Sequence, residues 1–546
     1  MNDKSALPAA RLREIARLYA AKKFDEVVRL TIPQAGDPPD IDYYRGMALA
    51  KLKRWSEARQ ALELGRRKAP KDKRFPTELA GIAFLQKQYG AAAKDLRRVL
   101  KLDPSDAYAL NFAATVYSLE GNLPAALQCW NRIGMPQIRE IAVRPEPRID
   151  PVLLRSAIDF SPAAVLTRPD LRTSQVLLGS LGIFSRTSLA LTPASRGGFT
   201  AQFAAEEKNG LQDANLTGLF SALRGLPYAT VYPEWFNLRH AAINLTSLLR
   251  WDPNKERVFA SFDGPFGENP KWRYNLTLDA RRENWNLTST LFGAAHPVSN
   301  LQLEKIEAGG EVENIVSGRL QWAAGVDFSG RTFRNVRSSN PSAARFFQNG
   351  FAAEYRSSFK ATLLDLPERR LLVSASASLN AGRLFSRGGS SFVQATAGTL
   401  AQWFPLGEGD DYEMRARIRA GATAGAVPFD DLFILGLERD NDLWLRAHIG
   451  TADGKKGSAP LGRDYTLINW NDSKNIYHNG FLSLKLGPFF DSGKITDPSH
   501  VFGSQKWLFD TGIEITVRVL GSATAELFFG KDLRSGRTTF YGTTSH

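Results

Sequence analysis

Residues 272–280 read WRYNLTLDA, and apolar and polar side chains alternate along this stretch. The apolar positions are Trp272, Tyr274, Leu276 and Leu278, and the polar positions are Arg273, Asn275, Thr277 and Asp279. Because successive side chains of a β-strand point to opposite faces, this alternation predicts a strand with one apolar and one polar face.

The same alternation returns throughout residues 211–546. It is found in YEMRARIRA (412–420), FLSLKLG (481–487) and GIEITVRV (512–519), and glycine, asparagine and aspartate separate such runs. Roughly 335 residues, at about 20 per strand and connection, predict an antiparallel sheet of about sixteen strands.

Two folds give this pattern: a soluble β-sandwich or barrel, and a transmembrane β-barrel. The polar face of 412–420 carries three arginines, Arg415, Arg417 and Arg419, which suit a water-filled lumen. Tryptophans near the predicted strand ends are typical of the aromatic girdles at membrane interfaces. They are Trp235, Trp251, Trp272, Trp403, Trp444 and Trp507. These features favour a transmembrane barrel over residues 211–546.

The composition agrees with several folded domains in one chain. Hydrophobic residues make up 43% of the 546 residues and charged residues 23%, which excludes a wholly disordered chain. No run approaches about eighteen apolar residues, so no transmembrane helix is expected. The net charge is +14, but lysine and arginine are scattered along the chain, so we expect membrane lipid and not nucleic acid as a partner.

Residues 1–135 have helical periodicity, and small residues recur in them at a constant interval. One series is Gly46, Ala80 and Ala114, and the other is Ala58, Ala92 and Ala126. Small residues at such positions let two helices of a pair approach closely, and this spacing resembles the tetratricopeptide repeat. The resemblance implies a helical solenoid with a concave surface for peptide binding or scaffolding.

Residues 136–210 predict a small domain of the order β-α-α-β-β. Its second helix ends in LLGSLGIFSR (177–186), which resembles the helix end of a POTRA module, L-x-x-L-G-x-F. The matching residues are Leu178, Leu181, Gly182 and Phe184. An unrelated small α/β domain is the alternative.

A POTRA-like module directly before such a barrel resembles the bacterial surface antigen superfamily, which includes the insertase of the BAM complex and the two-partner secretion transporters. The family's barrel has a lumenal loop whose arginine meets an aspartate on a late strand. LGPFFDSGKI (486–495) supplies Phe490, Asp491 and Gly493 of the late-strand motif, although no spacer separates Phe490 from Asp491.

The loop motif departs further from the family. Where the family has a glycine pair and then V/L-R-G-F/Y, this chain reads GLERDN (436–441). The resemblance assigns Arg439, which follows Gly436, as the loop arginine, with Arg446 and Arg463 as rivals. We expect a lumenal loop to lack a hydrophobic core, so an Arg439–Asp491 ion pair would be one of few ways to fix it. Breaking such a pair when it is partly buried costs roughly 3–5 kcal/mol.

No motif predicts an enzyme. The sequence contains no HExxH or GxSxG pattern and no cysteine or histidine cluster at metal-ligand spacing, so we expect no cofactor and no metal. The leading hypothesis is a protein that inserts or transports polypeptides, with the repeats and the POTRA-like module binding unfolded or partner polypeptides. A polysaccharide exporter and a barrel anchor for a partner complex are the alternatives.

The predicted location is the outer membrane of a Gram-negative bacterium, with residues 1–210 in the periplasm. The first residues lack a basic segment followed by an apolar one. We expect an export signal to have been removed or to precede this start. Residues 136–210 separate the first two hypotheses, because a β-α-α-β-β module favours polypeptide traffic and a continuing helical solenoid favours polymer export.

Overall fold

A computed structural model describes most of the chain. The described residues are 6–34, 36–195, 197–213, 216–289, 296–339, 346–386, 389–407, 412–479, 481–497, 506–519 and 523–545. The chain forms two compact units: residues 1–140 with 162–168 and 192–200, and residues 141–161, 169–191 and 201–546. The small module expected at 136–210 is therefore divided between them.

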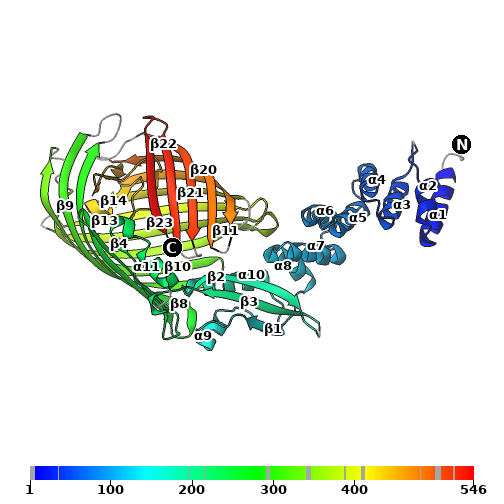
Figure 1. Cartoon of the computed structure of the whole chain (residues 1–546), viewed down its shortest axis with the longest axis horizontal. Coiled ribbons are helices and arrows are strands. Elements are labelled where there is room, and N and C mark those ends of the chain that lie inside the picture. The colour runs from blue at the N-terminus through cyan, green and yellow to red at the C-terminus, as the bar shows by residue number, and fades with distance from the viewer. Residues whose placement is uncertain are drawn as a thin grey trace. The chain divides into compact units, whose positions relative to one another are not determined.

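The N-terminal helical region is present, as predicted (Figure 1). Its helices are α1 (Ala6–Ala20), α2 (Phe24–Leu30), α3 (Pro39–Lys51), α4 (Trp55–Lys68), α5 (Arg74–Leu85), α6 (Tyr89–Leu102), α7 (Ala107–Leu119) and α8 (Leu123–Trp130). The helices in the described part of the chain are too short or too polar to cross a membrane.

The recurring small residues lie in the interior of the helical region. All six are buried: Gly46, Ala58, Ala80, Ala92, Ala114 and Ala126. A Cβ added to Gly46 on α3 would lie 2.5 Å from the Cγ of Leu62 on α4, closer than atoms can pack. At Gly46 the small residue therefore allows the close approach of α3 and α4.

The module contains β1 (Ile138–Val143), α9 (Pro151–Ser156), α10 (Arg168–Ser180), β2 (Phe184–Pro193) and β3 (Phe199–Glu207). This is the predicted β-α-α-β-β order, and its sheet has the order β1-β3-β2. The side chains of Leu178, Leu181 and Phe184 are buried. Gly182 has a φ of +73°, which ends α10 at low cost because glycine has no Cβ.

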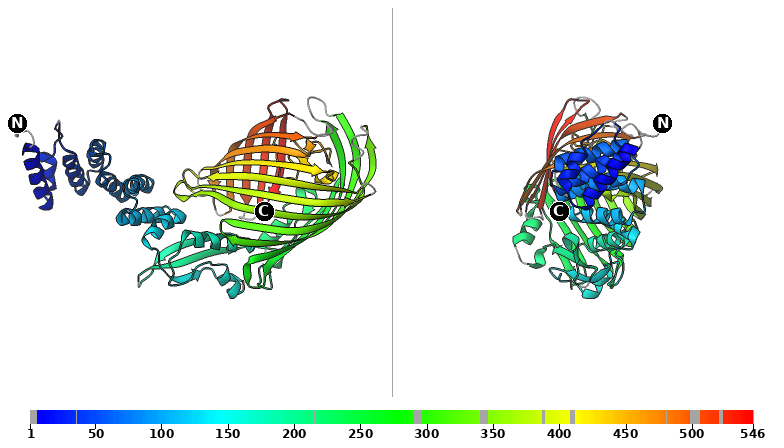
Figure 2. Two further views of the ribbon diagram at one scale, coloured as in Figure 1. Left: turned by 180° about the vertical axis from the view of Figure 1, so that it is seen from behind. Right: turned by 90° about the vertical axis from the view of Figure 1, so that its right-hand side faces the viewer.

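Residues 201–546 are dominated by one large antiparallel sheet, seen from two further sides in Figure 2. Before a long loop it contains β6 (Ile243–Asp252), β7 (Lys255–Phe266), β8 (Asn269–Ser289), β9 (His296–Ser317), β10 (Leu320–Ser338), β11 (Gly350–Leu366), β12 (Leu371–Phe385), β13 (Ser390–Trp403) and β14 (Tyr412–Gly425). After the loop it contains β19 (Asp464–His478), β20 (Leu482–Thr496), β21 (Leu508–Val519), β22 (Ala523–Asp532) and β23 (Thr538–Ser545).

The sheet begins with two short strands that share one neighbour. β4 (Thr230–Val231) and β5 (Glu234–Leu238) both pair with β6, after the helix α11 (Leu216–Leu223). Together they take the place of one strand, so the sheet in the described residues comes close to the sixteen strands expected. In the strand order of this sheet, the last strand, β23, is next to the first, β4.

The two faces of the barrel have the opposite polarity to those of a soluble protein. In the stretch 272–280, Leu276 and Leu278 are 53% and 49% exposed, whereas Arg273 and Asp279 are each 5% exposed. Arg273 pairs with Asp263 of β7 inside the barrel. An apolar surface facing outward round a charged interior is stable only in lipid.

The tryptophans agree with an interfacial position only in part. Trp251, Trp272, Trp403 and Trp507 are exposed, and Trp235 is half-buried. Trp444 does not belong to this group, because it lies in the long loop with its ring 5.5 Å from that of Phe528. The prediction failed there because alternation does not distinguish a strand end from a folded loop.

Part of the module packs directly on the barrel. The Arg172 side chain of α10 donates to the Gly318 carbonyl at 2.7 Å and pairs with Asp365 at 2.6 Å, so it joins the β9–β10 turn to the end of β11. Asn244 of β6 donates to the Leu181 carbonyl at 3.0 Å. A Cβ at Gly182 would lie 2.8 Å from that Asn244 amide, which is a second reason for glycine at this position.

Candidate functional site: the lumenal loop

The loop between β14 and β19, residues 426–463, folds into the barrel and contacts the charged inner face. It contains η5 (Phe429–Asp431), β15 (Phe433–Ile434), β16 (Thr451–Ala452), β17 (Lys455–Lys456) and β18 (Leu461–Gly462). β15 pairs with β18, and β16 pairs with β17. The loop is therefore a folded element and not an extended connection.

Apolar packing holds this loop, contrary to our expectation that it would lack a hydrophobic core. Phe429 packs with Trp285, Phe333 and Phe392 on one side of the barrel. Three leucines of the loop lie in two further clusters: Leu435 and Leu445 with Leu467 and Ile495, and Leu437 with Phe489 and Phe528. The inner face thus contains apolar positions that receive the loop, which alternation in the strands cannot reveal.

Arg446 makes the ion pair with Asp491. Its Nη2 lies 2.6 Å from Asp491 Oδ1, its Nε donates to Asp491 Oδ2 at 3.0 Å, and its backbone N–H donates to the same oxygen at 2.9 Å. The two side chains are 5% and 0% exposed. Arg446 also pairs with Glu514 of β21 at 2.8 Å and lies over the Phe489 ring at 4.1 Å.

The predicted Arg439–Asp491 pairing is therefore wrong, and the rival Arg446 takes this place. The Arg439 guanidinium lies 3.6 Å over the ring of Tyr228, and the Arg463 side chain donates to the Gly425 carbonyl. The reason is the turn between Arg439 and Arg446, in which the Asn441 amide donates to the Ile434 and Gly436 carbonyls, both at 2.9 Å. Because of this turn, the arginine that reaches Asp491 lies seven positions later in the sequence than the predicted one.

The residues of the late-strand motif alternate between the two faces of β20, as predicted, but the aromatic residue that faces inward is not the predicted one. Phe489, and not Phe490, is the inward aromatic: Phe489 is 1% exposed, whereas Phe490 is 38% exposed and stacks on Phe509. A Cβ at Gly493 would lie 3.1 Å from Leu445 of the loop. A Cβ at Gly436 would lie 2.6 Å from the His448 carbonyl oxygen. Both glycines allow the loop to pack tightly.

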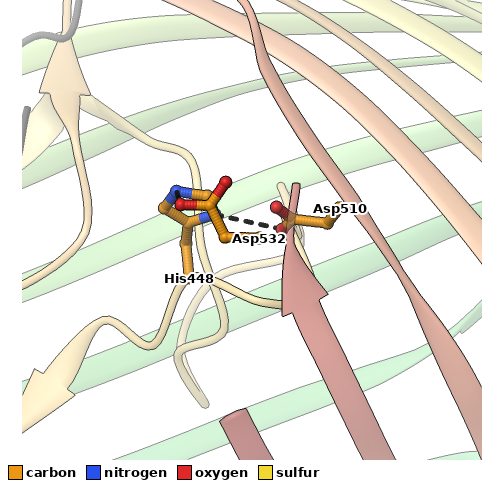
Figure 3. Close-up of side chains that lie close together, drawn as sticks. All are labelled: His448, Asp510 and Asp532. Atoms are coloured by element: carbon orange, nitrogen blue, oxygen red, sulfur yellow. Dashed lines mark hydrogen bonds and ion pairs between the residues drawn. The ribbon is translucent and has the colours of Figure 1, made fainter. Parts of the chain in front are cut away.

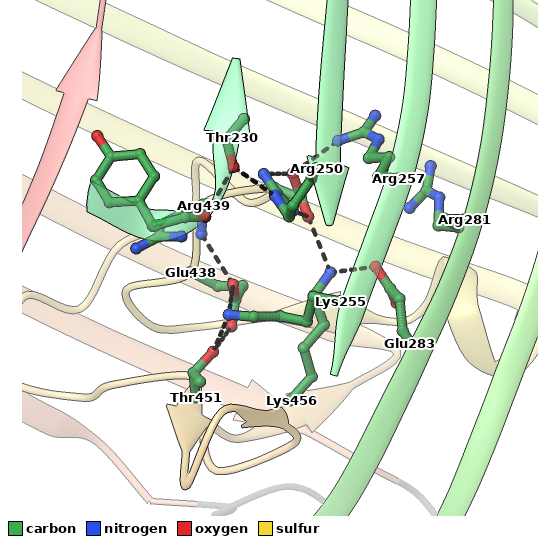
Figure 4. A network of polar contacts seen from close by, with 12 residues as sticks. Thr230, Arg250, Lys255, Arg257, Arg281, Glu283, Glu438, Arg439, Thr451 and Lys456 are labelled. Carbon is green, nitrogen blue, oxygen red and sulfur yellow. Dashed lines mark hydrogen bonds and ion pairs between the residues drawn. The ribbon is translucent and has the colours of Figure 1, made fainter. Parts of the chain in front are cut away.

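A second group of ion pairs, which sequence reasoning missed, joins the loop to the first long strands. Asp440 contacts Arg250 at 2.8 Å, Arg257 at 2.7 Å and Lys456 at 3.2 Å. Lys456 of β17 also pairs with Glu283 of β8 at 2.6 Å. Figure 4 shows the basic side chains of β6 and β7 pointing toward the loop. The sequence gives no sign of this network, because residues in contact, such as Arg250 and Asp440, lie 190 positions apart.

A third group lies at the start of the loop. Asp431 contacts Lys305 of β9 at 3.3 Å and Arg331 of β10 at 3.0 Å, and Asp430 contacts both at 3.1 Å. Arg419 of β14, one of the three arginines expected in the lumen, pairs with Asp442 of the loop. Together the three groups join the loop to strands that precede it and to strands that follow it in the sequence. A change in the position of the loop would therefore change the contacts of both sets of strands.

The molecule thus belongs to the class of large antiparallel barrels with an apolar outer face, a charged lumen and an infolded loop. No protein-family model and no curated protein sequence matches this chain.

Solved structures similar to it include BamA from Haemophilus ducreyi lacking POTRA domains 1–3, with 12% identity over 75% of this chain and 85% of that one, at a TM-score of 0.41. CdiB from Escherichia coli has 10% identity over 75% and 76%, at 0.49. CdiB from Acinetobacter baumannii has 12% identity over 82% and 81%, at 0.43.

Proposed function

We propose that this chain is an outer-membrane barrel that inserts or transports polypeptides, with residues 1–210 in the periplasm. The membrane location rests on the inverted polarity of the barrel. Leucines, phenylalanines and tryptophans of its outer face are exposed, whereas Arg250, Arg273, Arg331 and Asp279 of its strands are buried in ion pairs. Lipid is the solvent that this surface requires.

The observation that carries the polypeptide proposal is the seam between the last and first strands. β23 has eight residues and borders β4, which has two, whereas strands elsewhere in the sheet reach 22 residues. A strand edge that is paired over so short a length leaves backbone N–H and C=O groups with which another strand can form hydrogen bonds. In a membrane, where unpaired backbone groups are costly, a client strand would gain most by adding at this edge.

The lumenal loop is placed to act on this seam. The hydroxyl of Tyr228, two residues before β4, forms a hydrogen bond with Thr544 of β23. Arg439 of the loop lies on the Tyr228 ring, and Tyr541 of β23 packs against the loop cluster of Leu437. A shift of the loop would therefore disturb both sides of the seam at once.

The periplasmic arm fits the recruitment of clients. The sheet order β1-β3-β2 leaves β1 and β2 as edge strands, which suit strand addition by an extended polypeptide. The helical repeats would bind partners or clients on their concave side. The β-α-α-β-β order of residues 138–207 disfavours polysaccharide export, for which a continuing solenoid was expected.

A barrel anchor for a partner complex is the second candidate. The apolar packing of the loop against Trp285, Leu467 and Phe528 favours it, since a lumen filled in this way need not open. The two candidates differ in whether the seam must separate during function.

A reversible lock on the seam tests the proposal. Tyr228→Cys with Thr544→Cys places one thiol on each side of the seam, and a short, reducible bis-thiosulfonate cross-linker that fills the space of the removed phenol ring should join β23 to the start of the barrel. The native Cys129 is buried in α8 and does not compete. We expect cross-linking to stop the assembly of client proteins in the cell that makes this protein, as measured by outer-membrane proteomics, and a reductant to restore it.

The matched control shares one of the two substitutions. Ala525→Cys with Thr544→Cys joins β22 to β23, which are paired directly at these residues, and leaves the seam free. This pair should have no effect on client assembly. If the locked seam leaves the proteome unchanged while deletion of residues 1–135 releases a co-purifying partner, the anchor role replaces the proposal.

A further inference from the structure

His448 of the lumenal loop meets two carboxylates of the barrel wall. Its Nδ1 lies 3.0 Å from Asp510 Oδ2 on β21, and its Nε2 lies 3.8 Å from Asp532 Oδ2 on β22. One ligand atom of each residue lies within 4.8 Å of those of the other two. Figure 3 shows the three side chains converging from the loop and from two strands.

The strand register makes this a concentration of negative charge. Asp491 is directly opposite Asp510 on β20 and β21, and Asp510 is directly opposite Asp532 on β21 and β22. Like charges directly opposite each other in a sheet are destabilising. Arg446 is shared by Asp491 and Glu514, whereas His448 is the side chain placed between Asp510 and Asp532.

A second observation points to a ligand at this place. Asp510 is 0% exposed, its Oδ2 accepts hydrogen bonds from the Ala447 N–H at 2.7 Å and from His448, and its Oδ1 is buried without a hydrogen-bond partner among the described residues. Burial of a carboxylate oxygen without a hydrogen-bond partner raises the free energy of the folded state. A cation between the three side chains would remove that cost.

We propose that His448, Asp510 and Asp532 bind a divalent transition-metal ion, with the chemistry of Zn²⁺. Imidazole nitrogen and carboxylate oxygen are zinc ligands at about 2.0–2.2 Å, which in tetrahedral geometry separates two ligands by about 3.4 Å. The His448 Nε2 to Asp532 distance of 3.8 Å is close to this value. The His448 Nδ1–H donates to Asp510 Oδ2, so the atoms left to bind the ion are His448 Nε2, the Asp532 carboxylate and the second oxygen of Asp510, Oδ1.

Charge balance favours a divalent ion over a proton on His448. Two buried carboxylates with a neutral imidazole carry a charge of about −2, which a divalent ion neutralises fully and a protonated histidine only by half. Bound metal would fasten the loop to β21 and β22, next to the last strand of the barrel. The site would therefore couple metal binding to the position of the loop, whatever passes through the barrel.

Metal binding by the full-length protein tests this directly. The chain is purified in detergent without a histidine tag, freed of metal with a chelator, and titrated with Zn²⁺ in competition with a chromogenic chelator. We expect one equivalent of Zn²⁺ per chain. His448→Gln and Asp532→Asn should each weaken the affinity by at least about tenfold. The matched control is His478→Gln, which removes an exposed histidine at the end of β19.

Heat-modifiable electrophoretic migration shows whether each variant barrel has folded. If the variants do not fold, X-ray absorption at the zinc edge of the wild-type protein decides, and the site requires a single imidazole among oxygen ligands. Saturable binding that is unchanged in His448→Gln, a zinc spectrum without imidazole or with several, or no stoichiometric binding to the wild-type protein would each overturn the proposal.

Discussion

Arg446 and Asp491 lie 45 positions apart in the sequence and meet as a buried pair between the lumenal loop and β20. The arginine contacts both carboxylate oxygens, donates through its backbone as well, and packs on the ring of Phe489. This pair marks where the loop is fixed to the strands that follow it, and the Asp440 network marks where it is fixed to the strands that precede it.

The first prediction concerns that pair. Asp491→Ala leaves the Arg446 charge buried with Glu514 as its remaining carboxylate partner, and should lower the stability of the barrel by roughly 3–5 kcal/mol. Urea unfolding followed by tryptophan fluorescence measures this. Arg439→Ala is the control, because it leaves Asp491 paired. A loss in Arg439→Ala equal to that in Asp491→Ala would contradict the assignment of Arg446.

Exchange of the two charges gives a second prediction. Asp491→Arg alone places two cations together and should abolish function, and Arg446→Asp alone should do the same. The combined variant restores opposite charges and should recover part of the activity, although the backbone N–H of residue 446 then loses its acceptor. Client assembly in cells that express each variant measures this, with barrel folding checked by heat-modifiable migration.

Gly493 gives a third prediction. Its added Cβ would lie 3.1–3.2 Å from the ends of Leu435 and Leu445, so Gly493→Val should overpack the loop interface and cost about 1–3 kcal/mol. Gly330→Ala on β10 is the control, since nothing lies within 4 Å of a Cβ there. Equal unfolding midpoints for the two variants would show that the loop does not pack on β20 in solution.

Arg172 gives a fourth prediction, on the attachment of the module. Arg172→Ala removes the contacts with Gly318 and Asp365, and α10 should then exchange its amide hydrogens at least tenfold faster. Arg186→Ala, an exposed position on β2, should leave the exchange unchanged. Hydrogen exchange read by mass spectrometry distinguishes the two variants, and unchanged protection in Arg172→Ala would contradict the docking.

The fifth prediction concerns acid and the helical arm. The Asp106 carboxylate caps α7 by accepting from the Ala109 N–H, and its hydrogen bond with Lys73 lowers its pKa below the usual value. A lowered folded-state pKa gives stability that is present above the ordinary pKa and is lost as the pH falls through the folded value. Protection of α7 amides should therefore fall below about pH 4.

Two variants of Asp106 distinguish the effect of its charge from the effect of its capping hydrogen bond. Asp106→Ala should cost about 1 kcal/mol at pH 7 through loss of the cap. Asp106→Asn should keep the cap and lose the acid sensitivity, and an unchanged acid response in this variant would count against Asp106 as its source. Circular dichroism at 222 nm and hydrogen exchange of α7 measure both.

The sequence alone determined the periodic parts of this protein. Alternation in 272–280 predicted which side chains face outward, and the exposure of Leu276 and the burial of Arg273 follow it. The spacing of Gly46, Ala80 and Ala114 predicted helices, because a repeated contact between neighbouring helices leaves a repeated small residue. The helix end at Gly182 was also visible, since its conformation is set by local geometry.

Only the tertiary structure decided the site. Which arginine reaches Asp491 depends on a turn held by Asn441, and the apolar packing of Phe429 and Leu445 depends on strands far away in sequence. The meeting of His448 with Asp510 and Asp532 has the same origin. Periodicity records contacts that repeat along the chain, whereas a loop inside a barrel is placed by single contacts between distant residues, which leave no pattern in the sequence.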